Sequence, residues 1–303
     1  MEQFLVFTGR NLKLYFRDKG AVFFSLLSMI IVIALMVFFL GDMNVNEITD
    51  LLSQFSVRNP ETDKENAKML IYYWTSAGIL SINAVTVTLA VYSTMIKDRV
   101  NGKLNSIYTA PVNRAVITTS YIATAWVAAV MVCIFTLFVI EGYGVMQGVE
   151  LYSFFRHMQL LGVICMNAFL YAAIMYLLAM LAKTEGAWSG IGMVIGTLVG
   201  FLGGIYVPMG TLSEGVQTIL KCSPIIYSTA LFRTVMSENL IAETFTNVPE
   251  EVIAGYKEVM GIDIKVSEHL IKVPEICGLL LLITFLFVIL DICVLKYSKK
   301  ADR

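Results

Sequence analysis

Six long apolar segments alternate with polar connections along the chain. They cover about 21–40, 71–95, 115–140, 157–181, 188–208 and 276–295. An α-helix needs about 20 apolar residues to cross the hydrocarbon core of a bilayer, and every segment is about that long or longer. The pattern therefore predicts an all-α membrane protein, with six transmembrane helices in a single domain over residues 1–303.

Lys and Arg residues are concentrated in the segments that would share one side of the bilayer. Segments 1–20, 96–114 and the C-terminal tail carry four each, and the short link at 182–187 carries one. The segments on the other side are acidic: 41–70 has three Lys and Arg against six acids, and 209–275 has five against nine. Because cytoplasmic loops are enriched in Lys and Arg, both termini are expected in the cytoplasm.

The first twenty residues have the pattern of an amphipathic helix. At 100° per residue, apolar residues fall on one side and basic residues on the other. The apolar set is Phe4, Leu5, Leu12, Tyr15 and Phe16, and the basic set is Arg10, Lys13 and Arg17. A helix of this kind lies in the headgroup plane of the membrane. A cytosolic extension before the first span is the alternative.

Two further signals mark helices on the outer side. Thr62 and Glu65 have the spacing of a capping box, so the second span is expected to start as a helix in water. Residues 249–260 begin with a proline, which is typical of the start of a short surface helix. This helix would lie in an extracellular insertion over 234–275.

The fifth span and the stretch after it have an unusual pattern. Glycine recurs at every fourth position of the span, at Gly192, Gly196, Gly200 and Gly204. Such a face lets another helix approach closely, either for static packing or for a moving gate. The stretch 205–233, with Pro208 and Pro224, is too polar to span and too apolar for an exposed loop. It predicts a re-entrant hairpin of two short helices, broken near Ser223-Pro224.

Composition restricts the class of protein. Apolar residues make up 57% of the chain and charged residues only 15%, whereas soluble proteins average about 25% charged residues. A net charge of −1 gives no electrostatic basis for binding nucleic acid. The five cysteines form no CxxC and the two histidines no HExxH, so neither a disulfide framework nor a metal site is expected.

Known motifs for nucleotides and ions are missing. No GxxxxGK[ST] sequence is present, so the chain is expected to bind no ATP by a P-loop of its own. Gly190-Ile-Gly192 lacks the spacing of a dinucleotide fingerprint. Gly142-Tyr143-Gly144 lacks the residues that precede the glycine-tyrosine-glycine of a potassium filter, and a glycine-rich turn is the simpler interpretation.

Charged residues are also missing from the middle of the predicted spans. Glu141, Arg156 and Asp291 lie near span ends. Ion-coupled pumps and proton relays need ionisable groups at mid-depth. Active transport by this chain would therefore need an energy source outside the chain.

The connection between the second and third predicted spans resembles the signature of ABC type-2 export permeases. It reads KDRVNGKL over 97–104 and TAPVNR over 109–114. The positions that match the signature are Asp98, Gly102, Pro111 and Arg114, and the departures from it are Lys103 and Asn113. The order of an amphipathic first helix, six spans, a glycine-rich fifth span and a proline-containing stretch is also similar to this family.

The resemblance implies a transport subunit and not an enzyme. Such a subunit forms the path of an exporter, pairs with a second permease subunit, and binds a separate ATP-binding subunit that carries ATP and Mg. The residues implied in coupling to that subunit are Arg10, Lys13, Arg17, Asp98, Arg99, Gly102, Lys103, Pro111 and Arg114. The path would run between two chains, lined by their second and fifth spans, and the outer gate would be the 205–233 hairpin. The residues implied in the path or gate are Gly192, Gly196, Gly200, Gly204, Pro208 and Pro224.

The expected location is the bacterial plasma membrane, among membrane lipids and with no bound cofactor. The resemblance implies a drug, lipid, glycan, peptide or ion as the substrate, and the apolar spans favour an amphipathic or lipid-like one. Both a homodimer and a heterodimer fit the sequence. The alternatives are a secondary transporter or channel without an ATPase, which the missing inverted repeat disfavours, and an intramembrane enzyme, for which no nucleophile and base stand out.

Overall fold

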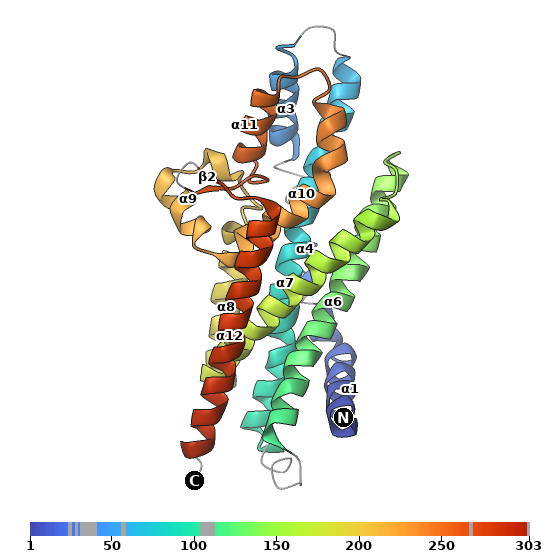
Figure 1. Ribbon diagram of the computed structural model, residues 1–303. Coiled ribbons are helices and arrows are strands. Elements are labelled where there is room, and N and C mark those ends of the chain that lie inside the picture. Colours follow the sequence, from blue (N-terminus) through green and yellow to red (C-terminus); the bar gives the residue numbers. More distant parts are fainter. Residues whose placement is uncertain are drawn as a thin grey trace.

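The computed structural model describes residues 1–23, 26–27, 30, 41–55, 59–103, 113–266 and 269–301. These residues form helices and one short antiparallel pair of strands (Figure 1). The elements are α1 (Glu2–Arg17), α3 (Gly41–Leu52), α4 (Pro60–Val100), α6 (Arg114–Met146), α7 (Phe154–Leu181), α8 (Glu185–Leu202), η2 (Met209–Thr211), α9 (Glu214–Lys221), α10 (Pro224–Thr244), α11 (Glu250–Val259), β1 (Lys265–Val266), β2 (His269–Leu270) and α12 (Val273–Ala301).

The longest helix, α4, lies at the centre of the fold. Its 41 residues extend about 60 Å at the usual rise of an α-helix. The side chain of Asn59 caps its start by accepting a hydrogen bond from the Glu61 N–H at 3.0 Å, and Pro60 occupies the first turn. The cap is therefore at Asn59, earlier than the expected capping box at Thr62. Helices α3, α6, α7, α8 and α10 all pack against α4.

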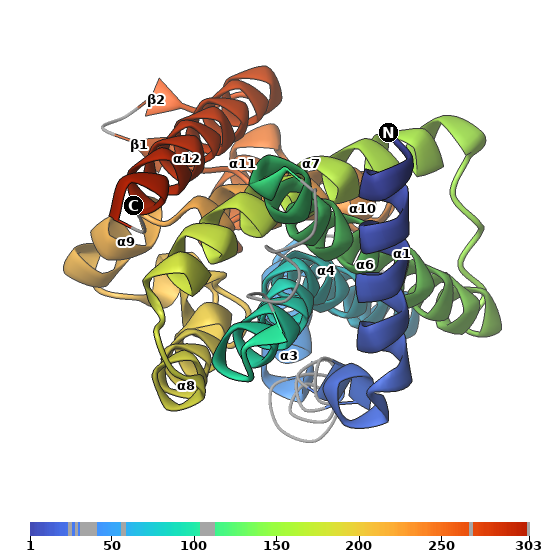
Figure 2. The same cartoon turned by 90° about the horizontal axis from the view of Figure 1, so that it is seen from below.

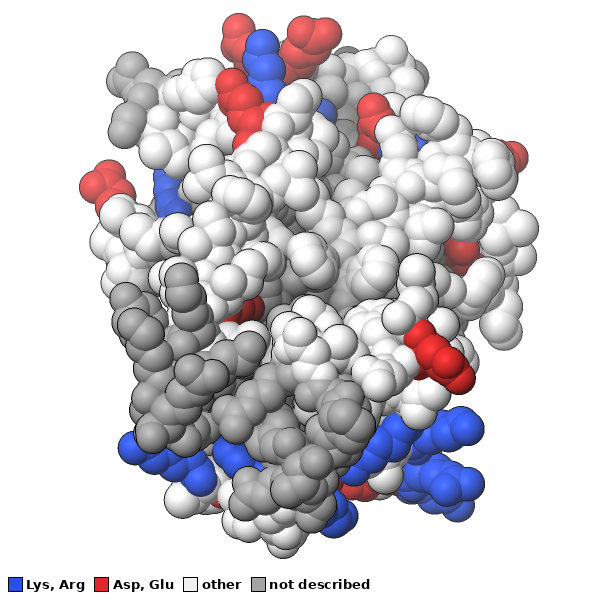
Figure 3. Space-filling model, turned by 60° about the horizontal axis from the view of Figure 1, so that its bottom comes forward, with Lys and Arg blue, Asp and Glu red and all other residues white. Residues whose placement is uncertain are grey.

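The other helices are arranged around this central helix. Viewed along its length, α1 lies beside α6, and α12 packs on α7 (Figure 2). One end of the molecule holds α1 and the last turn of α4, and the opposite end holds α3 and α11 (Figure 1). Lys and Arg side chains gather at the first of these ends (Figure 3), which we call the basic end and define by the exposed Lys13, Arg17, Lys97 and Lys103.

Within the described residues, five helices are long and apolar enough to cross a membrane: α4, α6, α7, α8 and α12. They correspond to the second to sixth predicted spans. Most of the first predicted span, 21–40, lies outside the described residues. Helix α8 ends at Leu202, so Gly204 and Pro208 belong to the turn that follows it and not to the span.

The expected hairpin region contains η2, α9 and α10. The break between its helices falls at Ser223-Pro224, as expected, with Pro224 in the first turn of α10. Helix α10 is longer than expected, because it continues to Thr244 and packs along α4 with most of its side chains buried. The remainder of the expected 234–275 insertion contains α11, which follows Pro249, and the two short strands.

Candidate coupling and translocation site

A buried carboxylate joins three helices at the basic end. Asp98, in the last turn of α4, is only 3% exposed. Its Oδ2 accepts hydrogen bonds from Arg10 Nη1 of α1 at 2.7 Å and from the Tyr121 hydroxyl of α6 at 2.9 Å. The Nζ of Lys103 lies 3.9 Å from Oδ1. We call Arg10, Asp98 and Tyr121 the inner junction.

The inner junction explains how α1 is placed. The residues that α1 buries are Thr8, Asn11 and Tyr15, and the helix packs on α6. Burial lowers the pKa of Arg10, but the hydrogen bond and charge of Asp98 outweigh it, and the net shift is upward. The expected separation of apolar and basic sides is therefore incomplete, since Leu5 is exposed and Arg10 faces the protein.

The remaining coupling candidates fall into two groups. Lys13, Arg17 and Lys103 have exposed side chains. Arg99 instead donates to the carbonyls of Ala179 and Ala182 at 3.1 and 3.0 Å, which joins α4 to the end of α7. Gly102 follows the Asn101 cap of α4 with a φ of 71°. Pro111 and the side chain of Arg114 lie outside the described residues, although Arg114 is the first residue of α6.

The glycine series of the fifth span divides into two halves. A Cβ added at Gly192 or Gly196 would meet no atom within 4 Å. A Cβ at Gly200 would lie 2.3 Å from the Tyr206 ring, and one at Gly204 would lie 3.2 Å from Ile226. The first two glycines therefore border open space, and the last two form close contacts within the chain.

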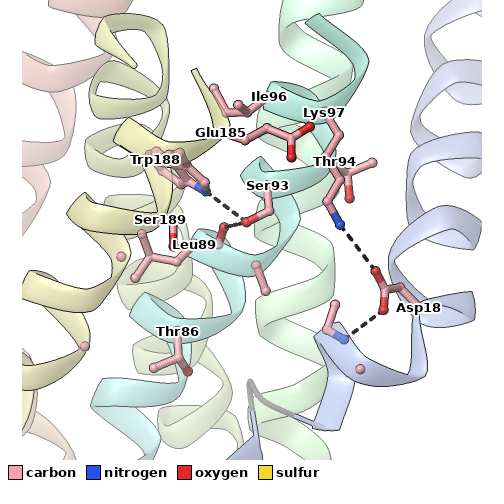
Figure 4. A pocket seen from close by; sticks show the side chains of 16 residues that line it. Asp18, Thr86, Leu89, Ser93, Thr94, Ile96, Lys97, Glu185, Trp188 and Ser189 are labelled. Atoms are coloured by element: carbon pink, nitrogen blue, oxygen red, sulfur yellow. Dashed lines mark hydrogen bonds and ion pairs between the residues drawn. The ribbon is translucent and has the colours of Figure 1, made fainter. Parts of the chain in front are cut away.

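The open half of α8 borders a cavity of about 830 Å³ between α4, α8 and the residues that follow α1 (Figure 4). The Trp188 indole Nε1 of α8 donates to Ser93 Oγ of α4 at 2.9 Å and fixes one wall. The other residues that line the cavity are Asp18, Gly20, Ala21, Thr86, Leu89, Ala90, Thr94, Ile96, Lys97, Glu185, Gly186, Ser189, Gly192 and Gly196.

A buried guanidinium joins the segments at the opposite end. Arg233 of α10 is 0% exposed and donates to the carbonyls of Gly204 at 2.7 Å, Met260 at 3.0 Å and Gly261 at 3.3 Å. Its guanidinium carbon lies 4.0 Å from the ring centroid of Trp74 of α4, whose Nε1 also donates to Met260. We call these five residues the outer junction.

Several of these residues were missed by sequence reasoning. Tyr121, Trp188, Glu185 and Trp74 are ordinary members of helical segments, and only their contacts mark them. Arg233 is one of the charged residues that make the 205–233 stretch too polar to span, and the sequence assigns it no further role. The presence of a lone charge within an apolar stretch was the one available signal for it.

Comparison with protein families gives one match. The family model described as ABC-2 type transporter matches residues 2–237. This range includes the inner junction, the cavity and the whole expected hairpin, but not Met260 and Gly261 of the outer junction. No curated protein and no solved structure matched the chain. Since the matched region covers well over half of the residues, the chain belongs to the ABC-2 type transporter family, as a multi-pass membrane permease.

Proposed function

We propose that the chain is the permease subunit of an exporter driven by ATP hydrolysis on a separate ATP-binding subunit. That subunit would bind the basic end, which would face the bacterial cytoplasm together with both termini. A second permease subunit, identical or different, would complete the path. The substrate would be an amphipathic, lipid-like, drug or peptide molecule.

The inner junction is the observation that carries this proposal. Asp98 is too buried to contact a partner directly, whereas Lys13, Arg17 and Lys103 around it are exposed. A partner that moved these exposed residues would therefore move α1 and the 101–113 connection against α4 through Asp98. Buried ion pairs with good geometry favour one arrangement of the elements that they join, as a coupling element requires.

The path would run along α4 and α8 of two facing chains. The cavity between these helices and the open space at Gly192 and Gly196 support this location. The outer gate would lie at the turn after α8 and at α9 and α10, where Pro208 and Pro224 interrupt helix formation.

Reconstitution with an ATP-binding subunit encoded beside this chain tests the proposal. We expect ATP-dependent export of an amphipathic dye by the complex in vesicles, and no export by the permease alone. Asp98→Asn and Gly102→Ala should leave the complex intact but reduce export per ATP hydrolysed by about tenfold. Ion-driven flux by the purified chain alone would instead support a secondary transporter or channel.

Glu61→Gln is the matched control, because Glu61 is exposed at the opposite end of the same helix as Asp98. It should preserve both ATP hydrolysis and export. If Asp98→Asn behaved like this control, the coupling role of the inner junction would be wrong.

A further inference from the structure

The cavity between α4 and α8 carries its charged lining residues toward one end, the polar end, and uncharged residues at the other (Figure 4). Glu185 and the backbone of Lys97 lie nearest the basic end of the molecule, the Asp18 carboxylate lies about level with Leu89, and Thr86 and Gly196 are at the other end. Lys97 and Thr86 are eleven residues apart on α4, so the cavity extends about 16 Å along the helix. This is the distance from a headgroup region to near the middle of a bilayer.

The charges at the polar end leave one carboxylate unpaired. Lys97 Nζ lies 3.8 Å from Asp18 Oδ2, so these two charges offset each other. Asp18 Oδ1 also accepts a hydrogen bond from the Ala21 N–H. Glu185 is directed into the cavity (Figure 4) and, among the described residues, has no hydrogen-bond or ion-pair partner. The charged residues that line the cavity, Asp18, Lys97 and Glu185, therefore sum to −1.

Glu185 is placed so that its carboxylate can meet a cationic group. It lies in the first turn of α8, after the Thr184 cap, where the helix dipole stabilises a negative charge. It is also exposed to the cavity opening, so it can exchange water for a cationic group at little cost. An anionic head at the same place would be repelled by Glu185 and would compete with Asp18 for Lys97.

The deeper part of the cavity suits an apolar body. Leu89, Ala90 and Trp188 provide apolar surface, and the Trp188 ring is held by its hydrogen bond to Ser93. Gly192 and Gly196 leave room along α8, because a Cβ at either position meets nothing within 4 Å.

We propose that this cavity binds amphipathic molecules with a cationic amine head, with the amine at Glu185 and the apolar body along α4 and α8. The inference rests on the proposed function, since it names the substrate class of that path. It assigns Glu185 as the residue that selects the charge of the head group.

Two probes with the same tail and opposite heads test this assignment. The probes 12-(dansylamino)dodecylamine and 12-(dansylamino)dodecanoic acid, each labelled at the end of the tail and free at the head, are titrated into phosphatidylcholine nanodiscs that contain the full chain. Energy transfer from tryptophan to dansyl is the signal. We expect the amine to bind more tightly than the acid. Glu185→Gln should weaken binding of the amine about fivefold, as for a partly exposed ion pair, and Glu185→Lys should reverse the preference.

Glu250→Gln is the matched control, since Glu250 is an exposed acid in the first turn of α11, outside both the cavity and the proposed gate. It should leave the binding of both probes unchanged. Gly196→Trp should block both probes, with its melting temperature checked against wild type. Equal binding of the amine by wild type, Glu185→Gln and Glu185→Lys would overturn the proposal.

Transport by the complex separates this inference from the proposed function. If Gly196→Trp stops ATP-driven export while the Glu185 variants keep the wild-type head-group preference, the path is supported and the substrate class is wrong. If Gly196→Trp abolishes probe binding but export continues, the binding site is supported and the path is wrong.

Discussion

At the scale of single residues, the two partners of the inner junction differ in exposure. The Asp98 side chain is 4% exposed and that of Arg10 is 33% exposed. Removal of Arg10 leaves a buried carboxylate whose other partners among the described residues are Tyr121 and the more distant Lys103. Removal of the Asp98 charge leaves a guanidinium that water can reach.

We therefore expect Arg10→Met to cost about 2 kcal/mol of stability and Asp98→Asn about 1 kcal/mol. Melting temperatures of the purified variants, measured by intrinsic fluorescence, give the order. Lys13→Met is the control, because Lys13 is exposed on the same helix. A larger loss from Asp98→Asn than from Arg10→Met would contradict the assigned asymmetry.

Asp291 of α12 is a second buried carboxylate, and it is unsatisfied. It is 3% exposed, and neither of its oxygens has a hydrogen-bond partner within the part of the chain that the structure describes. Because an unpaired buried carboxylate is unfavourable, Asp291→Leu should raise the melting temperature by about 5 °C. Asp50→Leu, at an exposed position, should leave it unchanged, and a lower melting temperature for Asp291→Leu would refute the expectation.

At the scale of elements, the two halves of the glycine series in and after α8 should respond differently. Gly192→Ala and Gly196→Ala add a methyl group to open space and should stabilise α8 by about 0.5–1 kcal/mol each. Gly200→Ala must displace Tyr206, and Gly204→Ala is strained by a φ of 60°. Melting temperatures of the four single variants check this difference between the two halves. Similar shifts in melting temperature for all four variants would contradict it.

The outer junction depends on the shape of Arg233 as well as its charge. Its carbonyl partners include Gly204 and Gly261, both with positive φ. A lysine ammonium cannot donate several coplanar hydrogen bonds, and it cannot stack on the Trp74 ring as a planar guanidinium does. We therefore expect Arg233→Lys to be nearly as destabilising as Arg233→Met, by about 3 kcal/mol.

Limited proteolysis gives a local measure of this loss. Cleavage in the 245–272 region should be much faster in both Arg233 variants than in wild type. Arg156→Lys is a useful comparison, because Arg156 also reaches α10, through the Val235 carbonyl and Glu238, but remains partly exposed. Full protection in Arg233→Lys would show that charge alone is sufficient.

The elements differ in how well sequence could predict them. Five apolar runs became the expected helices, because a continuous run of about 20 residues is a strong signal. Helix α10 was underestimated because its buried side chains include the polar residues Ser228, Thr229 and Arg233, which interrupt the apolar pattern that marks a buried helix. The Ser228 hydroxyl and the Arg233 Nη atoms donate hydrogen bonds within the protein. Asp98 could be singled out by resemblance, but its contact with Arg10 depends on how two distant helices are rotated, which one sequence does not encode locally.

At the scale of the whole molecule, two helices have largely exposed apolar faces. In the most apolar 18-residue segment of α8, only 17% is buried, and the same holds for the corresponding segment of α12. On α8 the exposed residues include Met193 and Val194, and on α12 they include Phe285. Lipid or a second permease subunit can cover such faces, and the proposed path assigns the partner to α8.

Cross-linking distinguishes the two faces. In a background with the exposed Cys222 and Cys293 replaced by serine, Val194→Cys should give a covalent dimer with a short bis-maleimide in membranes. Phe285→Cys should give little dimer under the same conditions. Dimer formation by Phe285→Cys and not by Val194→Cys would place the subunit interface on α12. A cross-linked product that contains a different chain would identify a heterodimer.

The uninterrupted length of α4 has a mechanical consequence. Trp74 of the outer junction and Asp98 of the inner junction lie on this one helix, 24 residues apart, or about 36 Å along its axis. An α-helix without a break transmits tilt and rotation along its length. A displacement imposed at Asp98 would therefore arrive at Trp74 as rigid-body motion, so the two ends of the permease would change together.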